Sequence, residues 1–189
     1  MAHDEIALYP LILGPAWEQV DRTVRRAHLS GRVLRAQGVF AIKHGARPPA
    51  RLIARLLLLP AESDSAPIHL EVTREGPGEH WSRTLGGRRM VTTQQASADG
   101  LLVERLGILE FHLRLGVVAG AITYSQEKAC LRLGRWLVPL ARWLAPAVSA
   151  REAAVRREGA VQVHVVITLP VVGPLLSYGG ELVFEEANA

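Results

Sequence analysis

The residues best suited to chemistry lie on a predicted strand over residues 109–117. Glu110, His112 and Arg114 alternate there with apolar residues, so their side chains share one face. A histidine beside a carboxylate can move a proton or orient a ligand when that face lines a concavity. A solvated outer face is the simpler interpretation of the same pattern. The spacing therefore allows either a site in a cavity or an exterior cluster of ion pairs.

A second candidate is His164, in the predicted strand Ala160–Leu169, whose sequence is AVQVHVVITL. Strict alternation places Val161 and Val163 on one face and His164 on the other, and β-branched residues favour a strand. Closure of the sheet would allow His164 to approach His112. Either histidine is then a candidate general base.

A third candidate joins two predicted strands. Trp81 and Arg83 share one face of the first strand, so the guanidinium is expected to stack on the indole or to reach a carboxylate such as Glu104. The structural interpretation is a contact that ties neighbouring strands together. The functional interpretation makes Arg83 an anchor for an anionic group of a ligand. Tyr124 and Tyr178, on further predicted strands, complete the set of candidate ligand contacts.

Familiar catalytic motifs are missing from the sequence. It contains no G-x-S-x-G, H-E-x-x-H, C-x-x-C, phosphate-cradling G-x-x-x-x-G-K or G-x-G-x-x-G. The single cysteine, Cys130, excludes an internal disulfide and a cysteine-rich metal site. We therefore predict no metal and no cofactor, and any active site must be assembled from residues on separate strands.

The charge distribution argues against several classes of partner. With 22 basic and 18 acidic residues the net charge is only +4, and arginines are scattered, so nucleic-acid binding is not expected. Two acids in the first residues make a signal peptide unfavourable, and a cytoplasmic location is expected. Trp136 and Trp143, interleaved with arginines, would suit a membrane interface. They also suit a lid over a barrel mouth, and the intervening prolines argue against membrane contact.

The elements needed to position these residues are mostly strands. The patterns predict a helix that begins at Gly14-Pro15 and ends at Ser30-Gly31, and a second, very apolar helix over Ala50–Leu59. Residues 62–67 suggest a polar linker, and residues 131–148 suggest short helical pieces or an ordered loop, because two prolines interrupt them. The rest alternates with period two between turn signals, which predicts about eight to ten antiparallel strands.

The fold expected from this pattern belongs to the α+β class. We predict a strongly curved antiparallel β-sheet or an incomplete β-barrel, with the two helices near the N-terminus packed on its open side. At 189 residues the chain is long enough for one domain with a substantial core, here residues 13–184 of a single domain over 1–189.

Several segments, in order, resemble the family called domain of unknown function 4166. They are LGPAWEQV (Leu13–Val20), LIARLLLLP (Leu52–Pro60), EHWSRTLGGRRM (Glu79–Met90), LLVERLGILEFHLRL (Leu101–Leu115), RWLAP (Arg142–Pro146) and LPVVGPLLSYGGEL (Leu169–Leu182). The resemblance implies that the chain occurs alone or beside an NAD(P)-binding oxidoreductase domain, and it supplies no catalytic residues. Two positions depart from the family pattern. Gly179-Gly180 follows Tyr178 where an aromatic-glycine-tryptophan run is usual, and a proline pair is reduced to Pro139.

Three functions are consistent with these observations. The first is a non-catalytic module that binds an apolar or amphipathic small molecule in the concavity of the sheet. The second is an enzyme, or an accessory subunit of an oxidoreductase, that uses His112 or His164 as a general base. The third is a protein-interaction domain that docks an NAD(P)-dependent oxidoreductase through the apolar helix, which requires that helix to be exposed.

Overall fold

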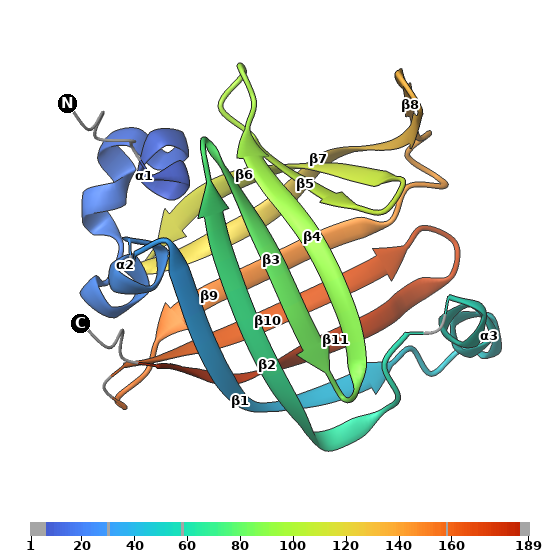
Figure 1. Cartoon of the computed structure of the whole chain (residues 1–189). Coiled ribbons are helices and arrows are strands. Elements are labelled where there is room, and N and C mark those ends of the chain that lie inside the picture. The colour runs from blue at the N-terminus through green and yellow to red at the C-terminus, as the bar shows by residue number, and fades with distance from the viewer. Residues whose placement is uncertain (1–6, 30, 58, 158, 186–189) are drawn as a thin grey trace.

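The sheet closes on itself. The computed structural model describes residues 7–29, 31–57, 59–157 and 159–185. Ten antiparallel strands form a closed barrel, and an eleventh, β8, pairs only with the end of β7 (Figure 1). The strands in chain order are β1 (Val33–His44), β2 (Ser63–Glu75), β3 (Gly78–Leu85), β4 (Arg88–Ala96), β5 (Leu102–Leu106), β6 (Leu109–Val118), β7 (Ala121–Leu133), β8 (Trp136–Pro139), β9 (Ala147–Ala154), β10 (Ala160–Leu169) and β11 (Gly173–Phe184).

Two pairings complete the circle. The meander from β1 to β7 continues through β9, β10 and β11, and β11 then pairs with β1. We call the pairing of β1 with β11 the seam. Gly38 of β1 and Gly180 of β11 lie at the seam, and an added Cβ on either glycine would meet a backbone oxygen of the opposite strand. The first and last strands therefore approach closely enough to bond along most of their length. This closure removes the exposed edges that an open sheet would have.

Three short helices lie at the two ends of the barrel. α1 (Leu8–Leu13), the 3₁₀ turn η1 (Gly14–Gln19) and α2 (Arg22–Leu29) cover one end, at the left in Figure 1. They bury Tyr9, Trp17 and Val24 against the interior. We call this end the closed end. α3 (Pro48–Leu56) lies beside the opposite end, which we call the open end.

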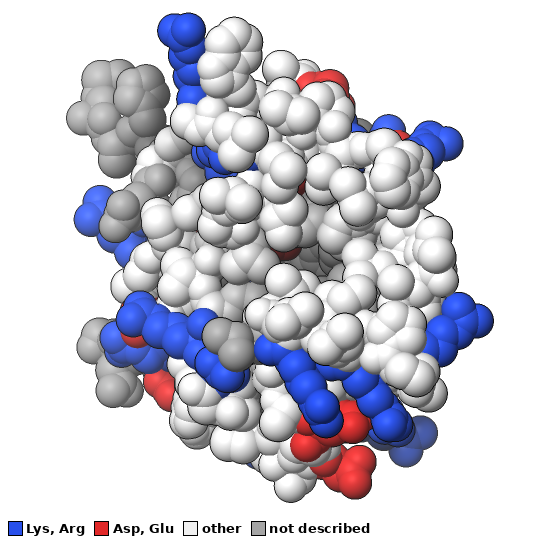
Figure 2. Space-filling view, turned by 90° about the vertical axis from the view of Figure 1, so that its right-hand side faces the viewer, with Lys and Arg blue, Asp and Glu red and all other residues white. Residues whose placement is uncertain are grey.

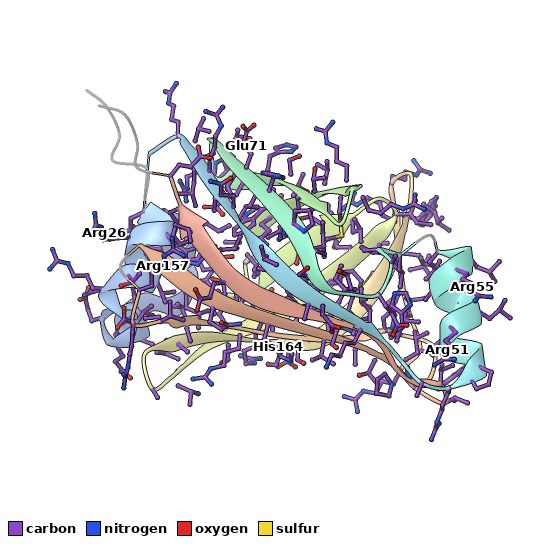
Figure 3. All side chains as sticks on the ribbon, turned by 90° about the horizontal axis from the view of Figure 1, so that it is seen from below. Arg26, Arg51, Arg55, Glu71, Arg157 and His164 are labelled. Atoms are coloured by element: carbon purple, nitrogen blue, oxygen red, sulfur yellow. The ribbon has the colours of Figure 1, made fainter. Side chains whose placement is uncertain are left out.

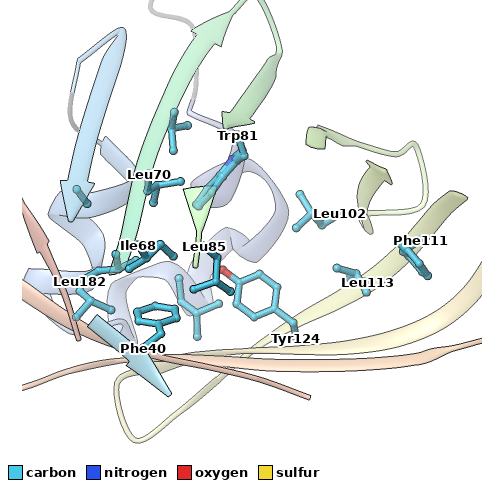
Figure 4. Close-up of a cluster of buried hydrophobic side chains, with 14 of the residues drawn as sticks. Phe40, Ile68, Leu70, Trp81, Leu85, Leu102, Phe111, Leu113, Tyr124 and Leu182 are labelled. Carbon is cyan, nitrogen blue, oxygen red and sulfur yellow. The ribbon is translucent and has the colours of Figure 1, made fainter. Parts of the chain in front are cut away.

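The apolar core lines the barrel and continues onto the helices at both of its ends. Its largest members come from strands all around the wall and include Phe40, Trp81, Leu102 and Tyr124 (Figure 4). Alternation accounts for this, since every second residue of a barrel strand points inward. The inward set of β1 is Leu34, Ala36, Phe40 and Ile42, as the sequence pattern predicts.

The structure corrects several details of the sequence-based expectation. The barrel is closed rather than incomplete, and the predicted first helix is divided because Val20 is extended between η1 and α2. Helix α1 was not expected. Residues 63–67 belong to β2 instead of a linker. Residues 131–148 contain no helix, because β7 continues to Leu133, β8 pairs back on it and β9 begins at Ala147.

Candidate functional site

The interior of the barrel is open to solvent beyond the core. Inward-facing residues of β9 and β10 are only partly buried, namely Val148, Ala150, Val163, Val165 and Ile167. An inward side chain of a closed barrel can reach water only through the interior. Figure 2 views the open end and shows a hollow near its centre, with the red of acidic side chains visible inside. We call this interior space the lumen.

One wall of the lumen is polar. Arg83 of β3 donates from Nη1 to Thr92 Oγ1 of β4 at 3.1 Å and to Glu104 Oε1 of β5 at 3.3 Å. The Arg83 and Glu104 side chains face inward, yet they are 16% and 18% exposed. The guanidinium also lies 4.9 Å from the centroid of the Trp81 ring, a cation–π distance. An ion pair thus stands in the lumen with part of its surface in water.

Electrostatics keep this arginine charged. Burial lowers the pKa of Arg83, but Glu104 and the hydroxyls of Tyr178 and Tyr9 outweigh burial, so the net pKa is raised. Burial raises the pKa of the Tyr178 hydroxyl, and the charge of Arg83 offsets part of that increase. Tyr178 belongs to β11, which β1 and β2 separate from β3 in the sheet. Arg83 therefore acts on a group from another part of the wall.

A hydrogen-bonded network lies at the closed end of the lumen. The Tyr9 hydroxyl donates to Gln94 Oε1 at 2.9 Å and accepts from the Tyr124 hydroxyl at 3.3 Å. His28 Nε2 lies 2.8 Å from Glu152 Oε2, and the His28 ring lies 3.7 Å from the Tyr9 ring between centroids. These contacts join α1 and α2 to β4, β7 and β9. They hold the helices in the barrel end.

The two carboxylates near this end differ in their partners. Burial raises the pKa of Glu152, but His28 and the Tyr124 hydroxyl outweigh burial and the net pKa is lowered. Glu79 instead accepts from Trp81 Nε1 at 2.9 Å and from Arg74 Nε at 3.0 Å. The indole is thereby fixed against the wall. Its ring is then available to support Arg83.

The sequence candidates divide between the two faces of the barrel. Trp81, Arg83, Glu104, Tyr124 and Tyr178 face inward, because their strand partners belong to the core set. The structure thus brings together the Trp81–Arg83–Glu104 group, at the distances given above. It adds both tyrosines to the same interior.

Glu110, His112, Arg114 and His164 lie on the outer face. Glu110 and His112 are buried there, where Glu110 accepts from Arg105 and Arg132 at 2.8 Å and lies 3.0 Å from His112 Nε2. Burial raises the pKa of Glu110, but these three partners lower it to about 2. Of the two interpretations that the sequence left open, the structure therefore fits the exterior cluster of ion pairs, because Phe111 and Leu113 occupy the inward positions of β6.

The other two outward residues are exposed. Arg114 is paired at the surface with Glu127, at 2.6 Å. His164 lies outside the wall, opposite Gly179 and Arg151, as Figure 3 shows from below. Closure of the sheet does not bring His164 to His112, since β7 and β9 lie between their two strands. Neither residue contributes to the lumen.

A family comparison agrees with the ordered segments of the sequence. A family model described as a domain of unknown function, DUF4166, matches residues 20–182. The chain belongs to the DUF4166 family. Searches of the curated proteins and of the solved structures found no match. In this DUF4166 chain the two departures noted from the sequence lie in different places: Gly179-Gly180 pair with β1 at the seam, whereas Pro139 ends β8 at the open end.

Two further findings concern the described part of this DUF4166 chain. It contains no helix of the length and apolarity that a membrane crossing requires. Nor do its histidine, cysteine and acidic side chains gather in a group of three or more that could hold a metal ion.

Sequence reasoning missed five residues of the interior. These are Tyr9, His28, Thr92, Gln94 and Glu152. The sequence carried a signal for two of them, because Thr92 and Gln94 occupy alternate positions of β4 as Trp81 and Arg83 do on β3. Tyr9 and His28 carried none, since their partners lie 85 and 124 residues away.

Proposed function

We propose that the DUF4166 barrel is a non-catalytic module that binds an amphipathic small molecule in its lumen. Ligand sites are typically concave and apolar, with a few placed polar groups. The valines, alanine and isoleucine of β9 and β10 would accommodate the apolar part of the ligand. Arg83, Glu104 and Tyr178 would meet its polar part.

The observation that carries this proposal is the exposure of the Arg83–Glu104 pair. A pair that served only to hold the wall together would be expected to exclude water, because buried charges need complete compensation. Here both side chains retain access to solvent inside a closed barrel. Glu104 uses only Oε1 toward Arg83, and the Tyr178 hydroxyl makes no hydrogen bond within the described residues. One acceptor and one hydroxyl are thus free for a ligand.

The charges facing the lumen favour a neutral or zwitterionic polar group over a strongly charged one. Arg83 is balanced by Glu104, and Glu152 is paired with His28. A ligand with a single net charge would therefore compete with an existing partner. A hydroxyl, amide or zwitterion can bond to the pair without separating it.

A catalytic role for the interior histidine receives less support. His28 and Glu152 have the separation expected of a general base and its orienting group. However, His28 is 1% exposed and the Tyr9 ring lies against it. A ligand in the lumen would meet Tyr9 first. The pair is better suited to anchoring the closed end.

Blocking the lumen tests the proposal. Ala150→Phe adds a ring on the inward face of β9, whereas Ser149→Phe adds the same ring on the exposed outward face one residue earlier. We would titrate both variants and the wild type with N-phenyl-1-naphthylamine and with a dansylated undecanoic acid, following fluorescence. We expect Ala150→Phe to weaken binding by about tenfold or more, roughly 1.4 kcal/mol, and Ser149→Phe to bind as the wild type does.

Native mass spectrometry of protein purified from its own host provides a second readout. We expect a small molecule to accompany the wild type and to be depleted from Ala150→Phe. Circular dichroism and thermal melts would establish that both variants are folded. Equal probe binding by folded wild type and Ala150→Phe, or a wild type that saturates with neither probe and carries no added mass, contradicts the proposal.

A further inference from the structure

Helix α3 exposes the large apolar residues that a surface helix ordinarily buries. Its buried residues are Ala50 and Ala54, whereas Leu52, Leu56 and the following Leu57 are 58%, 71% and 60% exposed. An amphipathic helix on a globular protein normally directs its large apolar residues to the core. α3 lies beside the open end (Figure 1), and its leucines are exposed to solvent there.

A second apolar projection lies on another part of the same end. All four residues of β8 are exposed, and Trp136 is 65% exposed. Trp143, in the segment that leads to β9, is 69% exposed. β8 and α3 lie at different sides of the open end in Figure 1, and the β10–β11 turn, with exposed Val171, lies on this end as well. The hollow is thus surrounded by exposed apolar side chains. We call these three projections the rim.

Arginines accompany the apolar residues of the rim. Arg51 and Arg55 lie on α3 (Figure 3), and Arg135 and Arg142 flank the two tryptophans, with the Arg135 guanidinium 5.2 Å from the Trp136 ring centroid. None of these four forms an ion pair with another described residue. Figure 2 shows blue side chains around this face, with a cluster of red ones between them at its lower edge.

The nearby acidic residues lie beside basic ones. Glu62 and Asp64, at the start of β2, line a pocket of about 480 Å³ that also contains Lys43 and Arg51. The pocket lies outside the lumen, next to α3. Arg51 therefore has acidic residues beside it. Among the residues described, the basic groups of the rim without an adjacent acid are Arg55, Arg135 and Arg142.

We infer that the rim docks the open end on an anionic membrane surface. Leucines and tryptophans would enter the boundary between headgroups and acyl chains, where indole rings are favoured. Arginines would extend to the lipid phosphates and add electrostatic attraction. The sequence alone favoured no membrane contact, since the prolines prevent a long amphipathic helix. The folded chain needs no such helix, because separate projections carry the apolar side chains.

The arrangement of the rim favours a bilayer over a protein partner. Protein interfaces have a continuous apolar core with matched shape. The rim residues stand on separate projections around a hollow, so a flat protein surface would leave the centre unfilled. Fluid lipid can surround each projection independently. The mouth of the lumen would then face the membrane, and a lipid could pass between the two, a step that rests on the proposed function.

Vesicle sedimentation tests the docking. The wild type is expected to bind vesicles of phosphatidylcholine mixed with phosphatidylglycerol, and to bind phosphatidylcholine alone or mixed vesicles at high salt more weakly. The paired change Trp136→Ser with Trp143→Ser is expected to weaken binding by about tenfold or more. Arg55→Gln with Arg142→Gln is expected to weaken it by about 30-fold at low salt. Leu11→Ser with Val118→Ser removes exposed apolar residues elsewhere than the rim and should change nothing.

Three outcomes would overturn the docking surface. In the first, the wild type does not bind the mixed vesicles. In the second, the variant with both tryptophans replaced binds them as strongly as the wild type does. In the third, the wild type forms a dimer or protein complex that this variant does not form, and neither protein binds vesicles. Brominated lipids add a direct readout, since they should quench the exposed tryptophans of the wild type.

The lumen variant separates this inference from the proposed function. Ala150→Phe leaves the rim unchanged and should bind vesicles as the wild type does. Vesicle binding without binding of either fluorescent probe would contradict the proposed function alone. Probe binding in solution without vesicle binding would contradict the docking alone.

Discussion

His28 Nε2 and Glu152 Oε2 lie 2.8 Å apart, although 124 residues separate them in the sequence. The contact joins α2 to β9 and therefore ties the N-terminal helices to a strand from the last third of the chain. Burial alone would raise the pKa of the Glu152 carboxyl, yet its net pKa is lowered because His28 and Tyr124 stabilise the charged form. The contact is thus both a structural link and a source of pH-dependent stability.

Removing the imidazole should loosen this link. We expect His28→Ala to lower the free energy of unfolding by about 2–3 kcal/mol at neutral pH, since a buried carboxylate loses its partner. The pKa of Glu152 in the folded protein lies below its usual value. Its contribution to the free energy of unfolding is therefore fully present at a pH above the usual pKa, and it is lost as the pH falls through the pKa of the folded protein. Urea unfolding at pH 7 and at acidic pH measures the change.

A matched histidine provides the control for this prediction. His164 is exposed on the outer face, and His164→Ala should change the free energy of unfolding by no more than about 0.5 kcal/mol. Equal effects of the two substitutions at neutral pH would show that the His28–Glu152 contact does not stabilise the closed end.

The Arg83–Glu104 pair should show strong coupling. We expect Arg83→Met and Glu104→Gln each to destabilise the barrel, and the double variant to lose less than their sum, with a coupling of about 1–3 kcal/mol. The reason is that each single change leaves one charge in the lumen without its partner. A double-mutant cycle by denaturant unfolding provides the measurement. Strict additivity would mean that water compensates each charge separately.

Alternation alone was sufficient to predict most of the strands, though not β8 and β9, and to group Trp81 with Arg83. Each fact depends on a local period of two, and β3, β6, β10 and β11 lie close to their predicted ranges. The pairing of Arg83 with Glu104 also followed from chain order, because β3, β4 and β5 are successive hairpins. Local rules therefore located one polar wall of the lumen.

Which face points inward could not be read from the polar residues. Glu110 and His112 are buried on the outer face because Arg105 and Arg132 compensate the carboxylate there. Burial and polarity thus coincide outside the barrel, and the polar pattern by itself left both the outer-face and the cavity-facing interpretation open. The closed-end network was also inaccessible, since Tyr9 and Gln94 meet only after the barrel closes. Long-range closure decides both points.

The exterior cluster should make stability depend on acidity. The Glu110 side chain is 3% exposed and its pKa is about 2, below its usual 4.5. A depressed folded pKa contributes stability above pH 4.5 that disappears as the pH falls toward 2. We expect Glu110→Gln to cost about 2–3 kcal/mol at pH 7, with the half-exposed arginines limiting the value.

Unfolding curves from pH 7 down to pH 2 check this prediction. The wild type and Glu110→Gln should converge as the wild-type carboxyl becomes protonated. Glu127→Gln is the control, because its ion pair with Arg114 is exposed and should contribute about 0–1 kcal/mol. A constant difference between wild type and Glu110→Gln over the whole range would contradict the assigned electrostatic role.

The seam between β1 and β11 should tolerate substitution less well than other parts of the wall. A Cβ on Gly180 would meet the backbone oxygen of Val39 and the Phe40 ring, and backbone cannot move aside without opening the seam. Gly180→Ala is therefore expected to cost about 1–3 kcal/mol in the free energy of unfolding. At Gly116 a Cβ would meet only the Thr123 hydroxyl, at 3.1 Å, which can rotate, so Gly116→Ala should be neutral or stabilising by up to about 1 kcal/mol. Equal stability of the two variants would mean that the seam is not close-packed. In that case Gly180→Ala should also bind the fluorescent probes as the wild type does.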